Sequence, residues 1–213
     1  MGTRAERKLA TERALRAAAL RLMTESGYDA TSTDDIARAS GVSPRTFFNY
    51  FPTKESVVLL PEQLLPDLVG AALQRRPAGE DVAASLAATA LETVSLLSEM
   101  AGSEDDGRLP LMAIRLMFSE RSVRSIFLER RAATEETIWM ILRERGVAAA
   151  DLSARAAVTT VMALTYLGLR LWAEGDGSET LVAAVARCLL LAPEPARFAA
   201  GVTARAASEH GVD

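Results

Sequence analysis

The stretch from Thr33 to Glu55 constrains the fold of this chain most, because it combines two short helical patterns with a turn signal between them. A hydroxyl residue can cap the first helix, and two aspartates in its first turn suit the positive end of the helix dipole. Gly41 then permits the left-handed backbone of a tight corner. Ser43 followed by Pro44 is typical of an N-cap and the first residue of a second helix. The sequence therefore predicts two short helices around a tight turn.

The second of these helices carries an apolar pair on one side and polar residues on the other. Phe47 and Phe51 are four residues apart, so they share a face and can pack against the first helix. The remaining arginine, hydroxyl, amide and phenol suit the major groove of DNA, where they can bond to base edges and phosphates. An ordinary helical hairpin with a polar surface is the alternative. The candidate DNA contacts on this helix are Arg45, Thr46, Asn49 and Tyr50.

This stretch resembles the N-terminal domain of the TetR family of transcriptional regulators, and the resemblance covers about the first 60 residues. The family pattern is a Gly-Val-Ser turn, a Thr-aromatic-aromatic recognition helix, a second aromatic pair, and a Lys-Glu pair that opens the next helix. These positions are filled by Gly41-Val42-Ser43, Thr46-Phe47-Phe48, Tyr50-Phe51 and Lys54-Glu55. The resemblance implies a helix-turn-helix that binds DNA, and it adds Thr33, Ser43 and Lys54 to the candidate DNA contacts. In the family, the lysine at the Lys54 position points at a phosphate.

Two positions depart from the residues that the family usually has. Phe48 stands where the family often has tyrosine, and Tyr50 stands where it often has histidine. A phenyl ring cannot donate a hydrogen bond to a phosphate, whereas the Tyr50 hydroxyl can.

The rest of the chain reads as a series of helices without a strand signal, so we expect an all-α protein of about nine helices. The resemblance implies a three-helix DNA-binding domain at residues 1–53, a ligand-binding and dimerisation domain at 54–200, and a flexible tail at 201–213. Pro61 and Pro66 interrupt the apolar run between the two domains, and each is easiest to place as the first residue of a helical segment. This run is the candidate hinge.

The composition argues against an enzyme. The only histidine, His210, lies close to the C-terminus, which leaves no material for a histidine-based triad, general base or transition-metal site. The single cysteine, Cys188, cannot form an internal disulfide, which fits a reducing cytosol. No apolar run approaches the length of a membrane span, and Met1 is followed by charged residues without a signal region. We therefore expect a soluble cytoplasmic protein without a cofactor.

The net charge of −4 is divided unevenly along the chain. Residues 1–60 carry nine Lys or Arg against seven Asp or Glu, which leaves the rest of the chain acidic. The local charge matters more than the total for where a polyanion docks. The basic excess is nevertheless too small to identify a DNA-binding protein, and that prediction depends on the motif.

The C-terminal helices carry large apolar groups that can line a cavity for a hydrophobic ligand, although such groups also form ordinary cores. Arg115 or Tyr166 could anchor the polar part of the ligand. The candidate ligand-binding residues are Met112, Arg115, Leu116, Phe127, Trp139, Met162 and Tyr166.

The last two long helices are the expected homodimer face, mainly because of the family resemblance. The apolar residues expected there are Val158, Val161, Met162, Thr165, Leu169 and Trp172, followed by Leu181, Val185, Leu189 and Leu190. The small residues Ala163 and Gly168 would let the two subunits approach closely. The same residues could instead pack within one subunit.

These observations predict a ligand-responsive regulator, a dimeric repressor that binds a palindromic DNA operator and is released by a small lipophilic effector. An acidic effector is favoured because Arg115 could pair with a carboxylate or phosphate, and a neutral aromatic compound is the next choice. Two alternatives remain: a transcriptional activator, or a small-molecule-binding protein of the same fold that does not read DNA.

Overall fold

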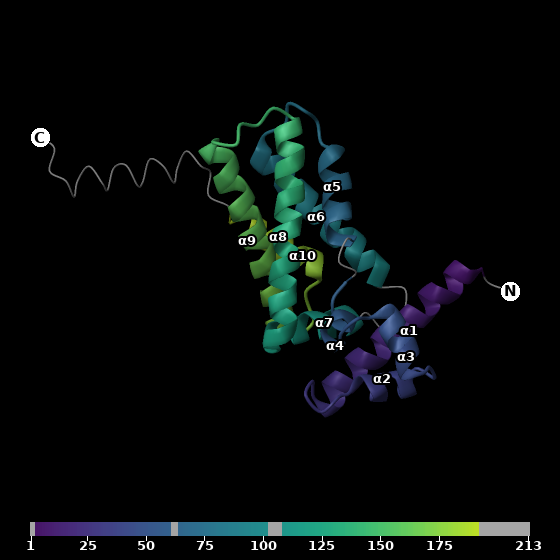
Figure 1. Ribbon diagram of the computed structural model, residues 1–213. Helices are drawn as coiled ribbons and strands as arrows, with labels where there is room; N and C mark the ends of the chain where they lie inside the picture. Colours follow the sequence, from purple (N-terminus) through teal and green to yellow (C-terminus); the bar gives the residue numbers. More distant parts are fainter. Residues whose placement is uncertain (1–2, 61–63, 102–107, 192–213) are drawn as a thin grey trace, which may run out of the picture.

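The computed structural model describes residues 3–60, 64–101 and 108–191, and this part of the chain contains ten α-helices and no strand (Figure 1). The all-α prediction is confirmed, with ten helices in place of nine. The expected tail, His210 and Pro61 lie outside the described residues. The helices are α1 (Arg4–Ser26), α2 (Thr33–Ala39), α3 (Pro44–Tyr50), α4 (Lys54–Val58), α5 (Leu64–Gln74), α6 (Val82–Ala101), α7 (Arg108–Ser119), α8 (Arg121–Glu144), α9 (Leu152–Glu174) and α10 (Leu181–Leu189).

Local signals set the boundaries of the first helices. The hydroxyl of Ser32 accepts a hydrogen bond from the Asp35 amide, and the Asp35 carboxylate accepts one from the Ser32 amide, so α2 begins with a capping box. Helix α2 ends at Ala39, and Gly41 in the turn that follows has a φ of +68°, which favours glycine. The amides of Gly41 and Val42 donate to the carbonyls of Arg38 and Ala37, which satisfies the end of the helix.

A first hydrophobic core joins the three N-terminal helices to α4, α7 and the start of α8. Leu15, Ile36 and Phe47 are fully buried in it together with Val57 of α4 and Val123 of α8. Helix α4 packs against α1, α7 and α8, and Figure 1 shows α4 and α7 between the N-terminal helices and the long α8. A displacement of α7 or of the start of α8 therefore bears directly on the helix-turn-helix, because well-packed interiors transmit strain.

A second core lies within the bundle of α5, α6, α8, α9 and α10. Leu73, Ile138, Val158 and Val185 are buried in it. Gly168 of α9 makes the close contact with α10 possible, since a Cβ atom there would lie 2.6 Å from the Cα of Val185. The prediction that Gly168 serves contact between subunits is therefore wrong, because the glycine faces a helix of its own chain.

The predicted dimer face is also wrong in part, because some of its residues lie in the second core. Val158, Val161, Val185 and Leu189 are buried within the chain. Helix α9 is apolar around most of its circumference, so the sequence could not tell its inner face from its outer face. The small and apolar residues exposed along the outer face of α9 are Ala156, Thr159, Ala163, Leu167 and Leu171. Leu152 is exposed at the start of α9, Ala183 is exposed on α10, and Leu190 is exposed directly after α10.

Arginines from one helix satisfy the C-terminal carbonyls of another in much of the structure. The last carbonyls of a helix lack partners within the helix and carry its negative dipole end, so a guanidinium that reaches them supplies both donors and charge. Arg16 and Arg130 donate to the carbonyls of Leu59 and Leu60 after α4, Arg145 to those of Leu73, Gln74 and Arg76 after α5, Arg124 to that of Phe118 in α7, and Arg115 to those of Ala173 and Gly175 at the end of α9.

Two helical segments, Val82–Glu99 and Leu152–Glu174, are long and apolar enough to cross a membrane, contrary to the expectation from the sequence. Both belong to the bundle, where α6 packs against α5, α9 and α10. Length and hydropathy alone do not identify a membrane span, because a core helix of a bundle passes the same test.

Candidate functional sites

Helix α3 presents a compact outer face that is held in place by its inner face. Phe47 is fully buried and Phe51 is 4% exposed, and their rings lie 5.8 Å apart against the first core. Arg45, Phe48 and Asn49 are exposed on the opposite side. No hydrogen bond or ion pair engages the side chains of Arg45 and Asn49 within the described ranges, so both can bond to a partner molecule without breaking an internal contact.

Phe48 belongs to this face although the sequence reasoning left it out of the candidate contacts. It is 51% exposed, and its ring meets that of Phe47 edge to face at 5.4 Å. The spacing of Arg45, Phe48 and Asn49, three and four residues apart, could have identified the shared face.

The other candidate contacts flank this face or support it. The Ser43 hydroxyl accepts from the Thr46 amide at 3.1 Å and lies 2.8 Å from the Thr46 hydroxyl, so both side chains cap the start of α3. Thr33 is half-buried at the first position of α2, and Tyr50 is half-buried against the first core. Their roles in DNA contact stay predictions.

Lys54 is engaged inside the domain. Its ammonium donates to the carbonyls of Tyr28 at 2.9 Å and Thr31 at 3.2 Å, and it lies 4.0 Å from the centre of the Tyr28 ring. In this arrangement Lys54 holds the turn between α1 and α2. A phosphate contact from Lys54 stays a prediction, and it would have to share the ammonium with these carbonyls.

Tyr28 connects the helix-turn-helix to the C-terminal part of the chain. Its hydroxyl lies 2.8 Å from the Glu55 carboxylate and 3.2 Å from the Ser122 hydroxyl in the first turn of α8. Burial raises the pKa of Tyr28 to about 12; the Ser122 bond opposes this rise and Glu55 adds to it. The phenol therefore stays protonated at neutral pH and can donate one hydrogen bond.

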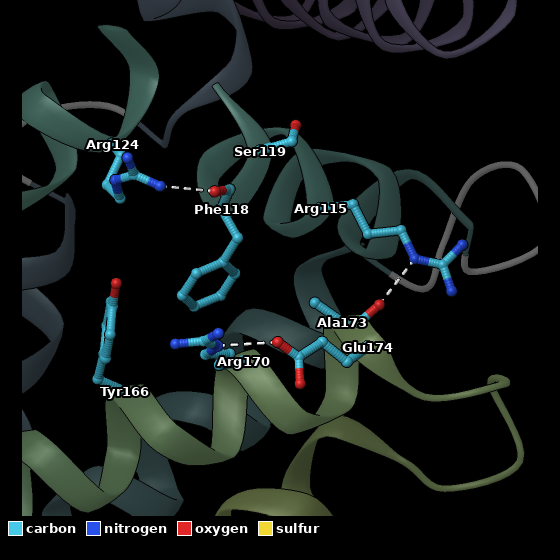
Figure 2. A pocket seen from close by; sticks show the side chains of 8 residues that line it. All are labelled: Arg115, Phe118, Ser119, Arg124, Tyr166, Arg170, Ala173 and Glu174. Carbon is cyan, nitrogen blue, oxygen red and sulfur yellow. Dashed lines mark hydrogen bonds and ion pairs between the residues drawn. The ribbon is translucent and has the colours of Figure 1, made fainter. Parts of the chain in front are cut away.

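A second candidate site is a hollow of about 590 Å³ between α7, α8 and α9, which lies within the range of small-molecule sites. Figure 2 shows the Phe118 ring projecting from α7 toward Tyr166 and Arg170 of α9. The Phe118 and Tyr166 rings lie 5.1 Å apart. The hollow is lined by Arg115, Phe118, Ser119, Arg124, Tyr166, Arg170, Ala173 and Glu174.

Of the seven ligand-binding candidates, the structure brings Arg115 and Tyr166 together in this hollow. Leu116 is buried in the first core, and Met112 and Phe127 pack against that core. Trp139 and Met162 pack against the second core. The sequence reasoning missed Arg124 and Arg170, although Arg170 follows Tyr166 by four residues and so shares its face of α9.

Comparisons with known proteins agree with the fold and the motif. Residues 15–59 match the family model described as bacterial regulatory proteins, tetR family. The HTH-type transcriptional regulator TcmR of Streptomyces glaucescens is 31% identical over 127 residues, which are 60% of this chain and 56% of TcmR. The match therefore spans little more than half the length of that relative.

One solved structure shares the fold over most of the chain. The fatty acid degradation regulator FadR from Bacillus halodurans has a TM-score of 0.53 at 21% identity, and the match covers 84% of this chain and 93% of that protein. FadR of Thermus thermophilus, a TetR family repressor solved in complex with lauroyl-CoA, has a TM-score of 0.48 at 27% identity over 86% of this chain and 98% of that protein. The match of residues 15–59 to the family model and the likeness to TcmR show that this chain belongs to the TetR family of transcriptional regulators.

Proposed function

We propose that this protein is a ligand-responsive transcriptional repressor that binds a palindromic DNA operator as a homodimer. The outer face of α3 carries the proposal: Arg45 and Asn49 are exposed without internal partners, and the helix is anchored by Phe47 and Phe51. Arginine can bond two acceptors of guanine, and asparagine can bond adenine in the same bidentate way. Thr33, Ser43, Thr46, Tyr50 and Lys54 would position the domain on the phosphate backbone.

The dimer would form through the exposed stripe of α9 and α10. Ala163 and Leu167 lie in the middle of this stripe, and Leu190 is 86% exposed at the end of α10. Two copies of such a stripe can bury each other around a two-fold axis, and that axis would relate the two α3 helices. A two-fold dimer reads a palindrome, because each α3 meets the same half-site.

The effector in this proposal is a small lipophilic molecule that binds the hollow between α7, α8 and α9, with an acidic compound favoured. It can release DNA only if it binds the non-DNA-binding arrangement more tightly, by about 1–3 kcal/mol of coupling free energy. We assign the helix-turn-helix domain to residues 1–53 and the effector and dimerisation domain to residues 54–200. We place the protein in the cytoplasm, where operator DNA is found.

Selection from a random duplex library tests the DNA-binding proposal. The wild-type protein should enrich a palindromic sequence, and the double variant Arg45→Ala with Asn49→Ala should enrich none. Failure of the wild type to enrich any sequence would favour the alternative of a small-molecule-binding protein that does not read DNA. If the selected site activates rather than represses a reporter gene in cells, the protein is an activator.

Light scattering tests the dimer. The wild type should have twice the mass of its chain, and Leu167→Glu should shift the mass toward that of one chain, because it places charge in the middle of the stripe. Leu128 is a matched control, since it is 45% exposed on α8 away from the stripe. A monomeric wild type, or equal effects of Leu167→Glu and Leu128→Glu, would contradict the proposed interface.

A further inference from the structure

The hollow between α7, α8 and α9 has a strongly cationic lining. Arg115, Arg124 and Arg170 line it, and Glu174 is the single carboxylate among the lining residues. Arg170 is paired with Glu174 at 2.8 Å. Two positive charges of the lining therefore remain without a carboxylate in the hollow, which favours an anionic occupant.

The three arginines are not equally available to a ligand. Arg115 donates from Nε to the carbonyl of Ala173 (Figure 2) and from one Nη to that of Gly175. Its guanidinium is therefore already engaged at the end of α9. Arg124 donates from one nitrogen to the Phe118 carbonyl at 2.8 Å, which leaves most of its five N–H groups for another acceptor. Arg170 is exposed and bonds Glu174 through Nε alone, so its terminal nitrogens are available as well.

The wall of the hollow suits a flat apolar body. The rings of Phe118 and Tyr166 lie 5.1 Å apart, and that of Phe127 stacks on Tyr166 at 6.0 Å. Arg131 lies over the Tyr166 ring at 5.9 Å, which adds positive charge beside the same aromatic surface. An aromatic or similarly flat group could stack on these rings while its charge reaches the arginines.

We infer that this hollow binds an organic anion with a flat apolar body, whose charged group bonds Arg124 and Arg170 and whose body stacks on Phe118 and Tyr166. This inference rests on the proposed ligand-responsive function and replaces Arg115 as the anchor. Arg115 is instead a positioning residue, because it ties α7 to the end of α9 and so keeps the wall in place.

The site also lies next to the contact between the two parts of the chain. The Arg124 bond to Phe118 closes the corner between α7 and α8, and Ser122 in that corner meets the Tyr28 hydroxyl. An anion that bonds the remaining N–H groups of Arg124 draws the guanidinium into the hollow and so lengthens its hydrogen bond to the Phe118 carbonyl. Occupancy of the hollow therefore weakens the hydrogen bond that joins the start of α8 to the end of α7. The helix-turn-helix contacts this junction through Tyr28 and Ser122.

Fluorescence titration with two matched probes tests the site. 1-Anilinonaphthalene-8-sulfonate carries a sulfonate, and N-phenyl-1-naphthylamine is its neutral counterpart. Arg124→Gln and Arg170→Gln should each weaken binding of the sulfonate by at least about tenfold, since each removes charge-assisted hydrogen bonds, and should change binding of the neutral probe by less than about twofold. Arg75→Gln is the matched control, because Arg75 is as exposed as Arg170 and also paired with a glutamate, Glu92, but lies outside the hollow and outside the proposed dimer stripe.

The outcomes separate this inference from the proposed function. Equal affinity for the sulfonate in wild type, Arg124→Gln and Arg170→Gln would overturn the anion site, as would an equal loss in Arg75→Gln. The sulfonate should also lower wild-type affinity for the selected duplex and have less effect on Arg124→Gln; an equal effect would overturn the role of the corner. If library selection yields no duplex, the proposed function fails, while the probe titration still decides the anion site.

Discussion

The hydroxyl groups of Tyr28 and Ser122 lie 3.2 Å apart and form the side-chain contact between the turn after α1 and the first turn of α8. Glu55 accepts from the same phenol at 2.8 Å, and Lys54 covers the ring. The residues that open α4 therefore hold Tyr28 where it meets α8. The contact links the position of the DNA-binding helices to that of the C-terminal bundle. Its partial burial strengthens the hydrogen bond, because the local dielectric is lower than in water.

A double-mutant cycle of Tyr28→Phe and Ser122→Ala should reveal this link. We expect a coupling of about 0.5–1.5 kcal/mol in the free energy of unfolding, the usual net value of a hydrogen bond. Urea denaturation of the wild type, both single variants and the double variant measures it. Additive effects within about 0.3 kcal/mol would mean that the two hydroxyls do not interact.

Gly168→Ala should destabilise the protein by about 1–3 kcal/mol, because the added methyl group would lie 2.6 Å from the Cα of Val185 and α9 would have to move away from α10. Gly79 is the control, since its backbone has an ordinary φ and nothing lies within 4 Å of a Cβ there. Gly79→Ala should change stability by less than about 0.5 kcal/mol. Thermal or urea unfolding compares the two variants. Equal losses of stability would mean that the close contact between α9 and α10 does not restrict position 168.

Glu80 makes the protein more stable above about pH 5 than below it. Its hydrogen bond with Arg76, followed by that with Ser85, lowers the pKa of Glu80 to about 2. A lowered pKa means that the folded state favours the carboxylate, so the stabilisation is complete above the unfolded pKa near 4.5 and is lost as pH falls toward 2. The difference in stability between wild type and Glu80→Gln should therefore shrink over this window. A difference that does not change with pH would contradict the ion pair.

Phe48 should contribute an apolar contact in the major groove rather than a phosphate contact. An exposed phenyl ring beside Arg45 and Asn49 can cover a thymine methyl group, at about 0.8 kcal/mol for one methyl. Replacing single thymines of the selected duplex by deoxyuridine should weaken wild-type binding at one position in each half-site and have no effect there on Phe48→Ala. If every thymine can be replaced without loss, Phe48 does not read a methyl group.

Features that depend on neighbouring residues could be predicted from the sequence. The cap Ser43, the glycine at Gly41 and the Phe47 and Phe51 pair all act within one or two turns of chain, and the structure has each in its expected place. Pro66 was expected as the first residue of a helical segment and lies in the first turn of α5, where a missing N–H costs little.

Features that depend on distant helices could not be predicted. Arg115 looked like a ligand anchor because the sequence gives its charge, but not the carbonyls of Ala173 and Gly175 that it bonds. Several residues predicted to form the dimer face are buried within the chain, and the sequence could not show this because α9 is apolar on both faces. The sequence also could not show that Lys54, predicted to contact a phosphate, donates to carbonyls in a turn more than 20 residues earlier.

The measurement that most directly tests whether α3 reads DNA is fluorescence anisotropy with the selected duplex and a scrambled duplex. We expect Asn49→Ala to lose about 1–3 kcal/mol of discrimination per half-site and to keep its affinity for the scrambled duplex, because a base contact specifies and a phosphate contact positions. Arg75→Gln, which lies after α5 and outside both α3 and the proposed dimer stripe, should match the wild type with both duplexes. Equal affinity of Asn49→Ala and wild type for the selected duplex, or an equal loss with both duplexes, would contradict the assignment of this face to base recognition.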